Sequence, residues 1–326
     1  MQDEHVETNH NHESVSFGPL IDDALVLTGP TASGKSAVAI ALAKRTGGEI
    51  LSLDSIAVYR EMDIGTAKPT TAQQQQVPHH LVDLVDPTEE FSVACYLRMA
   101  HQRVRQLKEL GRVPIFAGGT PMFLKGVLRG FDPGPPADWD FRQAVEADIE
   151  RYGVEALRQR LRQVDPLAAH RIGPNDTRRM IRALEVVRQT GTPISHRQVQ
   201  FDRHRAADSC RVFSLQWPRP QLHERINHRV QRMFDDGLVD EIRKLLDKHG
   251  ELSRTACQAV GYREVIDWIR QGGDLDETIE AVSAHTRQLA RRQETWLRSF
   301  SEIRPIAVEE PMDPEIIAEQ IHGMIS

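Results

Sequence analysis

The chain has 326 residues, of which 40% are hydrophobic and 27% are charged, and its formal net charge at pH 7 is −6. This length predicts one large α/β domain and a smaller one, and the negative balance argues against a protein that is basic over its whole surface. The three cysteines are far apart and form no C-x-x-C motif, which counts against a disulfide framework or a zinc site. No apolar run approaches membrane-spanning length, so we expect a cytoplasmic protein.

The N-terminal segment, residues 1–19, is polar and contains His10 and His12. Its composition predicts a disordered tail, because it has few apolar side chains that a core could bury. A metal-binding role for the histidines is the alternative, and their spacing gives it little support.

The stretch Gly29 to Ser36 (GPTASGKS) fits the phosphate-loop pattern G-x-x-x-x-G-K-[ST] at every fixed position. The apolar run 24–27 before it predicts a buried strand, and the run 37–45 after it predicts a helix, which is the context that the pattern requires. Such a loop binds a di- or triphosphate through inward-pointing N–H groups, the helix N-terminus and the lysine. The Ser36 hydroxyl is placed to hold Mg²⁺. The predicted diphosphate-binding residues are Gly29, Thr31, Ala32, Ser33, Gly34, Lys35 and Ser36.

Two further strand ends carry residues suited to chemistry. Residues 49–53 predict a strand that ends in Asp54, and residues 113–117 predict another that ends in Gly118-Gly119-Thr120. Ligands of open parallel sheets bind beyond the carboxyl ends of the strands, so we expect Asp54 near the phosphate loop in a catalytic or metal-binding role. Glycine at the second corner allows the backbone to approach a ligand closely. The pair His79-His80 is more typical of a loop held by hydrogen bonds than of a metal site.

A proline- and glycine-rich segment at residues 131–138 predicts a domain boundary. The residues after it show helical patterns and no convincing strand. We therefore predict a disordered tail at 1–19, a phosphate-loop core at 20–138 and 206–326, and an all-helical insertion domain at 139–205. The insertion contains 13 arginines, no lysine and nine acidic residues, a net charge of +4.

The densest basic stretch of the insertion contains Arg178 and Arg182, which are four residues apart and share a helix face. A solvated basic face is one interpretation. The exclusive use of arginine favours contact with phosphate or nucleic acid, because a guanidinium makes paired hydrogen bonds to phosphate oxygens.

The last third of the chain predicts a return to the sheet. Residues 211–217 have the pattern of a strand, residues 286–298 that of a second basic helix, and residues 305–326 that of a closing strand and helix. The whole pattern predicts an α/β fold: a P-loop NTPase-like parallel sheet with flanking helices and an all-helical insertion domain.

These parts by themselves leave the reaction open. A small-molecule kinase with the insertion as a lid over ATP is one candidate, although the insertion is large and rich in arginine for a lid, and no second strand end clearly supplies a separate metal-binding acid. A switch-type GTPase is disfavoured because the chain lacks an N-K-x-D guanine signature. A nucleotide-dependent binding module without chemistry is a third class.

Eight segments point to one family. They are Gly29–Ser36, Asp54-Ser55 with Tyr59, Met62–Pro69, Val77–His80, Gly118–Thr120, Asn175-Asp176 through Glu185, Gly261-Tyr262, and Arg291–Gln293 with Thr295-Trp296. They cover about residues 24–300, and apart from the phosphate loop no single segment is decisive. In this order the segments make the chain resemble the tRNA dimethylallyltransferases of the bacterial type, also called tRNA isopentenyltransferases. The zinc finger of the eukaryotic type is absent from the sequence.

The resemblance implies transfer of a dimethylallyl group from dimethylallyl diphosphate to N6 of the adenosine 3′-adjacent to the anticodon in tRNA, with release of pyrophosphate. It implies that the phosphate loop and Mg²⁺ hold the departing diphosphate and that Lys35 stabilises its charge. Asp54 would be the catalytic base, and Thr120 would hydrogen-bond at the same site. The adenine must leave the anticodon-loop stack to reach them. A monomer that binds the tRNA anticodon stem-loop is the expected form.

The resemblance also implies a tRNA-binding surface, with its basic part in the insertion and in the last long helix. The implied contacts are Asp54, Ser55, Ile56, Ala57, Thr120, Arg142, Arg178, Arg179, Met180, Ile181, Arg182, Gln258, Ala259, Val260, Gly261, Tyr262, Arg263, Arg291, Arg292, Gln293, Thr295, Trp296 and Arg298. The chain departs from the family at Ile56-Ala57, in a turn where glutamine is common two residues after the serine. This chain therefore has no glutamine there for a base-specific contact.

Overall fold

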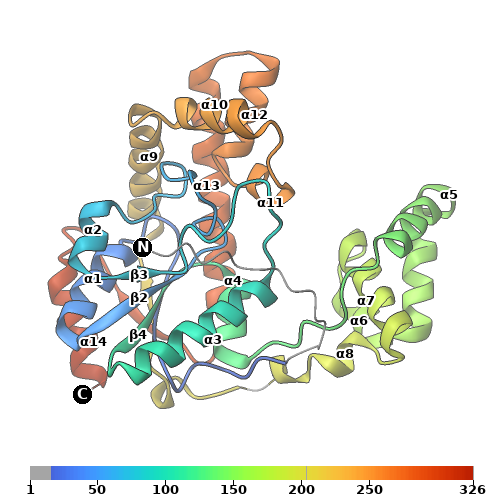
Figure 1. The fold of residues 1–326 in the computed structure, drawn as a ribbon, viewed down its shortest axis with the longest axis horizontal. Helices are drawn as coiled ribbons and strands as arrows, with labels where there is room; N and C mark the ends of the chain where they lie inside the picture. Colours follow the sequence, from blue (N-terminus) through green and yellow to red (C-terminus); the bar gives the residue numbers. More distant parts are fainter. Residues whose placement is uncertain (1–15, 203, 326) are drawn as a thin grey trace. The chain divides into compact units, whose positions relative to one another are not determined.

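The computed structural model describes residues 16–202 and 204–325 of the chain (Figure 1). These residues form two compact units: a helical unit, made of residues 16–18 and 130–202, and a core unit, made of residues 19–129 and 204–325. The helical unit begins before residue 139 because Arg182 donates to the carbonyl oxygens of Pro133 and Pro135, each at 2.8 Å. These bonds attach the proline-rich segment to the helices that follow it.

Residues 1–15 of the predicted disordered tail, which was expected to span residues 1–19, lie outside the described residues. At its described end, Phe17 exchanges two backbone hydrogen bonds of 2.9 Å with Phe131 of the helical unit. Leu20 and Ile21, which follow the tail, are buried in the core unit.

A six-stranded sheet in the order β3-β2-β4-β1-β5-β6 forms the centre of the core unit, and every neighbouring pair is parallel. Every residue of the central strand β1 is buried, which is typical of a parallel sheet covered by helices on both faces. The predicted parallel sheet is confirmed. The strands are β1 (Leu25–Thr28), β2 (Gly48–Leu53), β3 (His79–His80), β4 (Val113–Gly118), β5 (Val212–Gln216) and β6 (Arg304–Ala307).

Two helix pairs cover the sheet (Figure 1). Helices α1 and α14 pack together and share one buried apolar cluster with strands β1 and β5. Helices α3 and α4 pack together where the rings of Tyr96 and Phe123 stack 3.9 Å apart. The helices of the core unit are α1 (Lys35–Thr46), α2 (Thr71–Gln76), α3 (Val93–Glu109), α4 (Pro121–Arg129), η2 (Ala207–Ser209), α9 (Arg219–Asp235), α10 (Leu238–His249), α11 (Arg254–Cys257), α12 (Tyr262–Gln271), α13 (Leu275–Leu297) and α14 (Pro314–Ile325). Over the described part of the chain, no helix is both long and apolar enough to span a membrane.

The loop that follows β2 is held by α10 and α12. Its residues Tyr59 and Met62 are fully buried in a cluster with apolar side chains of these helices. The carboxylate of Glu241 on α10 accepts the backbone N–H of Ile64 at 2.8 Å. The loop begins at Asp54, so these contacts fix the backbone that carries this residue.

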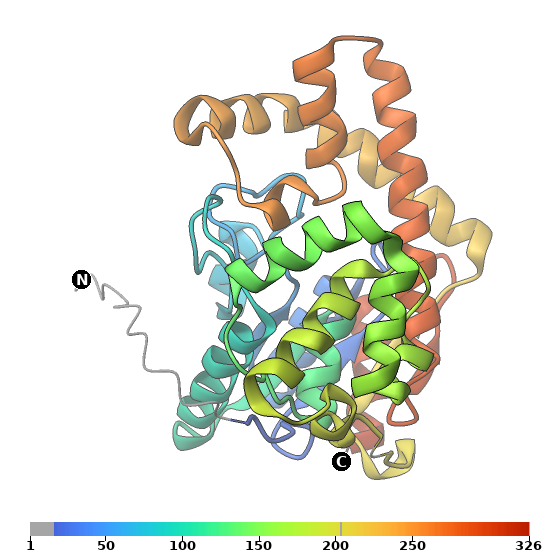
Figure 2. The ribbon, with the colours of Figure 1, turned by 90° about the vertical axis from the view of Figure 1, so that its right-hand side faces the viewer.

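The described residues of the helical unit form helices and no named strand. Its longest helix, α5, bends at Gly153, whose φ of 80° and ψ of 165° lie outside the helical range. The two halves of α5 are visible in green in Figure 2. Phe141, Leu161 and Met180 are among the buried side chains of its core. The helices are α5 (Trp139–Val164), α6 (Pro166–Arg171), α7 (Thr177–Thr190), α8 (Ile194–Arg197) and η1 (Val199–Asp202).

A buried ion pair in the core unit lies where the chain leaves for the helical unit and returns. Arg129, the last core residue before the helical unit, donates to both carboxylate oxygens of Glu302 at 2.8 and 3.0 Å, and both side chains are buried. His204 follows the helical unit, and its Nδ1 lies 3.3 Å from the same guanidinium. The core unit therefore holds the two ends of the insertion close to one another.

Gly118 supplies a test of the sheet. It pairs with Leu53 across β4 and β2, and a Cβ at this position would lie 2.3 Å from the carbonyl oxygen of Leu53. We expect Gly118→Ala to lower the free energy of unfolding by about 1–3 kcal/mol or more, because the strands must move apart. Thermal and urea unfolding measure the loss. Gly323→Ala on α14 is the matched control, since no atom lies within 4 Å of its added Cβ, and equal stability of the two variants would contradict the tight approach.

Candidate active site

The phosphate loop leaves β1 and enters α1, as its motif predicts. Gly29 and Gly34 have φ of 148° and 84°, and Ala32 between them has φ of 61°. A Cβ at Gly29 would lie 3.1 Å from the carbonyl oxygen of Leu215 on β5, so the loop passes the sheet at a distance that favours glycine. The loop ends at the N-terminus of α1, whose first N–H groups have no partner within the helix and can bind an anion.

Side chains from three distant elements hold the phosphate loop. Trp217, at the end of β5, and Arg225, on α9, donate to the carbonyl oxygens of the loop residues Ser33 and Ala32, each at 3.0 Å. Gln293 on α13 accepts an N–H of the loop at 2.8 Å. The loop conformation therefore depends on the packing of the whole core unit as well as on its own glycines.

Lys35 is the first residue of α1, and its Nζ donates to the carbonyl oxygen of Pro30 at 2.7 Å. Burial and, to a smaller extent, the charge of Arg229 lower the pKa of Lys35, and the charge of Asp54 partly opposes them, which leaves this pKa at about 7. A diphosphate bound beside the ammonium group would restore its full charge.

Asp54 follows β2 and begins a tight turn. Its Oδ1 accepts the backbone N–H groups of Ile56 and Ala57 at 2.8 and 3.2 Å, which fixes the carboxylate. Within the described residues, Oδ2 forms no hydrogen bond and can accept one from a ligand. The charge of Asp54 acts on the pKa of both Lys35 and Arg229, so the carboxylate lies near the phosphate loop. The position expected from the strand ends is therefore the observed one.

Thr120 joins the ends of β4 and β2. Its Oγ1 accepts the backbone N–H of Ser55 at 3.0 Å, and its own N–H donates to the carbonyl oxygen of Leu53 at 3.1 Å. The hydroxyl thus holds the residue next to Asp54. A direct contact of Thr120 with a substrate stays a prediction.

Arg229 on α9 was not among the residues predicted for this site. Burial lowers the pKa of this guanidinium, and the charge of Asp54 raises it. Arg229 also lowers the pKa of Lys35, so two cations and one carboxylate share this site. A signal was present in the sequence, because Arg229 follows Leu222 by seven residues and Ile226 by three, a spacing that places it beside these buried apolar side chains on one helix face.

Ser36, the predicted Mg²⁺ ligand, is exposed in the first turn of α1. A hydroxyl is a neutral oxygen donor of the kind that Mg²⁺ takes together with phosphate oxygens and water. No group of three or more His, Cys, Asp or Glu side chains that could hold a metal occurs over residues 16–202 and 204–325. Ser36 thus fits a metal that is shared with a diphosphate.

In the helical unit, the predicted tRNA contacts separate into exposed and buried side chains. Arg178 and Arg179 are exposed on α7. Met180 and Ile181 are 0% and 5% exposed and belong to the core of the unit. Their burial contradicts a direct contact between these two side chains and tRNA, because the contact would require the core to open.

Arg142 and Arg182 are largely engaged within the helical unit. Both donate to the carboxylate of Glu185, which is 0% exposed, with Arg142 at 2.8 and 2.9 Å. Burial by itself would raise the pKa of Glu185, yet the hydrogen bonds from Arg142 and Arg182 hold this pKa below its ordinary value. These two arginines neutralise a buried carboxylate, so they are weaker candidates for phosphate contact than their exposed neighbours.

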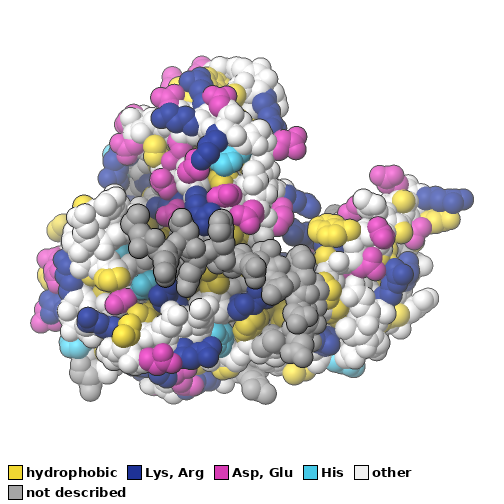
Figure 3. All heavy atoms as spheres, in the orientation of Figure 1, with side chains coloured by type: hydrophobic (Ala, Val, Ile, Leu, Met, Phe, Trp, Pro, Cys, Tyr) yellow, Lys and Arg dark blue, Asp and Glu magenta, His cyan; other side chains and the backbone are white. Residues whose placement is uncertain are grey.

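The core unit divides its predicted tRNA contacts in the same way. Gln258, Arg263, Arg291, Arg292, Thr295 and Arg298 are exposed, whereas Ser55, Ile56, Val260 and Trp296 are partly exposed. Ala57, Ala259, Gly261, Tyr262 and Gln293 are buried. The Tyr262 hydroxyl donates to Glu241 at 2.6 Å, and burial raises its pKa. The contact surface predicted for this segment is therefore limited to its exposed side chains. On the face drawn in Figure 3, basic and acidic side chains are interspersed.

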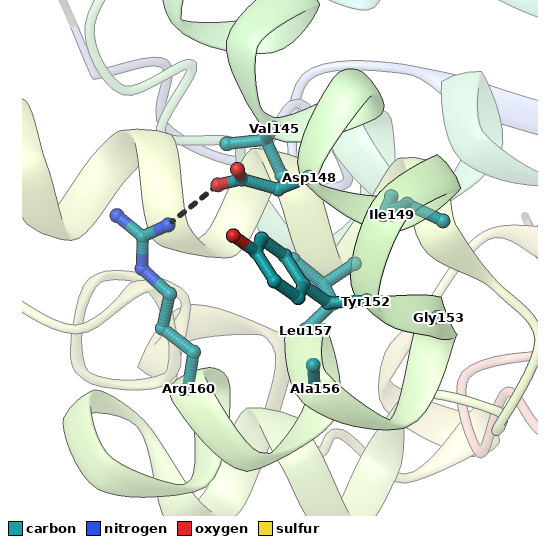
Figure 4. Close-up of a pocket in the computed structure, with 8 residues that line it drawn as sticks. All are labelled: Val145, Asp148, Ile149, Tyr152, Gly153, Ala156, Leu157 and Arg160. Atoms are coloured by element: carbon teal, nitrogen blue, oxygen red, sulfur yellow. Dashed lines mark ion pairs between the residues drawn. The ribbon is translucent and has the colours of Figure 1, made fainter.

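Two other features lie apart from these residues. His79 bonds to the carbonyl oxygen of Val77 at 2.8 Å and His80 to the carboxylate of Glu49 at 2.6 Å, so both histidines form hydrogen bonds as expected, although they belong to the edge strand β3 and not to a loop. A pocket lies at the bend of α5 in the helical unit, with the Asp148–Arg160 ion pair on one side (Figure 4). It contains no predicted site residue. Its lining residues are Val145, Asp148, Ile149, Tyr152, Gly153, Ala156, Leu157 and Arg160.

The sequence matches known proteins along most of its length. A family model described as IPP transferase matches residues 57–300. The tRNA dimethylallyltransferase of Rhodopirellula baltica is 57% identical over 320 residues, which cover 96% of each chain. That of Geobacter sulfurreducens is 43% identical over 283 residues, which cover 86% of this chain and 90% of the relative.

Solved structures show the same fold. The full-length tRNA isopentenylpyrophosphate transferase from Bacillus halodurans has a TM-score of 0.66 and 38% identity, and the match covers 93% of this chain and 97% of that one. A eukaryotic dimethylallyltransferase acting on tRNA has a TM-score of 0.71 and 25% identity, over 88% of this chain and 74% of that one.

The low pKa of Lys35 predicts a pH dependence. Its charge is lost as the pH rises above about 7, and a bound diphosphate would restore it. Binding of Mg²⁺-pyrophosphate should therefore take up more protons at about pH 8 than at about pH 6. Calorimetric titration in buffers of different ionisation enthalpy measures this uptake. In Lys35→Arg the guanidinium stays charged at both pH values, so proton uptake at pH 8 should not exceed uptake at pH 6. If the variant keeps the greater uptake at pH 8, Lys35 is not the group that takes up the proton.

Proposed function

We propose the reaction of this chain from one premise: the chain belongs to the IPP transferase family, that of the tRNA dimethylallyltransferases. It is a transferase that attaches a prenyl group to tRNA. The proposed donor is dimethylallyl diphosphate, and the proposed acceptor is N6 of the adenosine on the 3′ side of the anticodon. The kinase considered from the sequence is set aside, because the relatives and the solved structures are tRNA prenyl transferases.

The arrangement of three strand ends carries this proposal. Strands β2, β4 and β1 are neighbours in the sheet, and their carboxyl ends lead into Asp54, Thr120 and the phosphate loop. The loop suits a diphosphate, and the carboxylate suits an amine that must lose a proton. One edge of the sheet thus supplies groups for both substrates.

On the donor side, the bond between the allylic carbon and the diphosphate oxygen breaks, and both electrons leave with the diphosphate. The negative charge that builds on this leaving group would be stabilised by the N–H groups of the loop, by Lys35 and by Arg229. Ser36 would hold Mg²⁺, which when bound adds positive charge to the same diphosphate.

On the acceptor side, the new bond forms between the allylic carbon and N6 of the adenine. N6 is a poor nucleophile because its lone pair is delocalised into the purine. Oδ2 of Asp54 would accept a hydrogen bond from the N6–H group, which makes N6 a better nucleophile. The same oxygen would take the proton as the carbon–nitrogen bond forms. Thr120 contributes by holding Ser55, and through it the turn that carries Asp54.

The exposed arginines are the proposed contacts to the tRNA backbone. Arg178 and Arg179 on α7, together with Arg291, Arg292 and Arg298 at the end of α13, would bind the anticodon stem-loop, whose unstacked loop allows an adenine to be extruded. The expected monomeric state and cytoplasmic location belong to this proposal.

The proposed reaction and the role of Asp54 are tested in one assay. Wild-type protein with Mg²⁺, unmodified tRNA and dimethylallyl diphosphate should release pyrophosphate and add one dimethylallyl mass to the tRNA, whereas ATP should not replace the donor. Asp54→Asn should lower turnover by about 10²–10⁴-fold and keep tRNA binding, because the amide cannot take the proton.

Asp267→Asn, at an exposed position on α12, is the matched control and should keep wild-type turnover. ADP formation without tRNA modification would overturn the proposed reaction. Wild-type turnover in Asp54→Asn would remove Asp54 as the base.

The arginines of α7 predict two different phenotypes. Arg178→Ala should weaken tRNA binding and reduce the slope of log affinity against log salt by about one, with Tm unchanged. Arg182→Ala should instead lower Tm, because the buried carboxylate of Glu185 loses a partner. Arg103→Ala, which removes an exposed charge from α3, is the control for charge alone. A Tm loss in Arg178→Ala, or an unchanged salt slope, would contradict a surface role.

A further inference from the structure

We propose that Gln293 is a positioning residue that sets the separation between the phosphate loop and the corner at Gly118-Gly119-Thr120. It would thereby fix the donor diphosphate relative to the groups that face the acceptor. The inference rests on the proposed function and deepens it. It also replaces the tRNA contact that the family resemblance implied for Gln293.

The side chain of Gln293 bridges the two segments with one amide group. Its Oε1 accepts the backbone N–H of Thr31 in the phosphate loop at 2.8 Å, and its Nε2 donates to the carbonyl oxygen of Gly119 at 3.0 Å. The side chain is 8% exposed. We call this pair of bonds the Gln293 bridge.

The backbone geometry leaves little freedom around the bridge. A Cβ at Gly119 would lie 2.7 Å from Nε2 of Gln293 and 2.9 Å from the carbonyl oxygen of Gly29. The start of the phosphate loop and the end of β4 are therefore almost in contact, and the glutamine fills the remaining space. A shorter side chain could not reach both partners.

The bridge also determines which polar groups face a diphosphate. Without Gln293, the carbonyl oxygen of Gly119 would be an unpaired acceptor beside the phosphate loop and would repel an anion. With Gln293 in place, the N–H of Thr31 is already occupied, so the other N–H groups of the loop are left for the diphosphate. This arrangement argues against the predicted diphosphate contact of Thr31 where that contact would use its backbone N–H.

The effect of Gln293 reaches the acceptor side through one continuous segment. Gly119 is followed by Thr120, which bonds to the backbone of Ser55 and Leu53 on either side of Asp54. A shift of the corner would therefore move the proposed base relative to the diphosphate. Misplacement of reacting groups by about 1 Å is enough to slow a reaction about 10²-fold.

Two variants test the bridge. Gln293→Glu keeps an acceptor for Thr31 but loses the donor to Gly119 and adds a negative charge beside the loop. Gln293→Ala removes both bonds. We expect either variant to raise KM for dimethylallyl diphosphate and to lower kcat, so that kcat/KM for this donor falls by about 10- to 100-fold. KM for tRNA should change less than about twofold. Gln288→Ala, an exposed glutamine of the same helix, is the matched control and should behave as wild type.

A direct measurement accompanies the kinetics. Calorimetric titration with inorganic pyrophosphate and Mg²⁺ should show weaker binding by Gln293→Glu than by wild type, while the salt slope of tRNA binding stays the same. Gly119→Ala, which pushes on the bridge from the other side, should weaken pyrophosphate binding as well. Tm values show whether each variant is folded. If Gln293→Ala does not fold, the test of the bridge rests on Gln293→Glu, whose side chain has the shape of the native one.

The outcomes separate the bridge from other roles. Unchanged pyrophosphate binding and donor KM in Gln293→Glu would overturn the inference, and a raised KM for tRNA with a reduced salt slope would return Gln293 to the tRNA surface. If wild-type protein transfers no prenyl group to tRNA, the proposed function fails. Pyrophosphate binding still tests the bridge in that case, since it requires no turnover.

Discussion

Close approach of backbone at the carboxyl edge of the sheet is the constraint on which the rest of this structure depends. Gly29 passes β5, Gly118 lies against Leu53, and Gly119 lies against the start of the phosphate loop, each too close for an added Cβ to fit without a shift. Glycine at these three positions lets the segments approach closely, so the groups that border them lie near one another. Asp54, Thr120 and Lys35 occupy those bordering positions. The close backbone contacts therefore determine where their side chains lie relative to one another.

The same edge concentrates charge that the protein does not balance internally. Burial lowers the pKa of both Lys35 and Arg229, the charge of Arg229 lowers the pKa of Lys35 as well, and one carboxylate, Asp54, raises both pKa values. A site with an excess of poorly solvated cations gains more from a diphosphate than a solvated surface would, because the anion supplies the missing counter-charge. The affinity for the donor and the stabilisation of the leaving group then have one physical source.

Prediction from the sequence succeeded where the signal was local. The phosphate loop, the buried strands and the positions of Asp54 and Thr120 at strand ends follow from short patterns and from one rule about parallel sheets. It failed where the partner lies far along the chain: Gln293 bonds to a residue 262 positions away, and the partners of Arg142 and Arg182 include a buried glutamate that no charge count reveals. Arg229 lies between these cases, because its place beside buried Leu222 and Ile226 could have marked it as inward-facing.

The ion pair of Arg129 with Glu302 has a consequence for how such a chain can change over evolution. Contacts within the core unit keep residue 129 and residue 204, the two attachment points of the helical unit, close to one another. Insertions are best tolerated where both attachment points are already neighbours. A helical unit of different length or charge can thus be accommodated while the two strand-bearing segments that flank it keep their positions in the sheet.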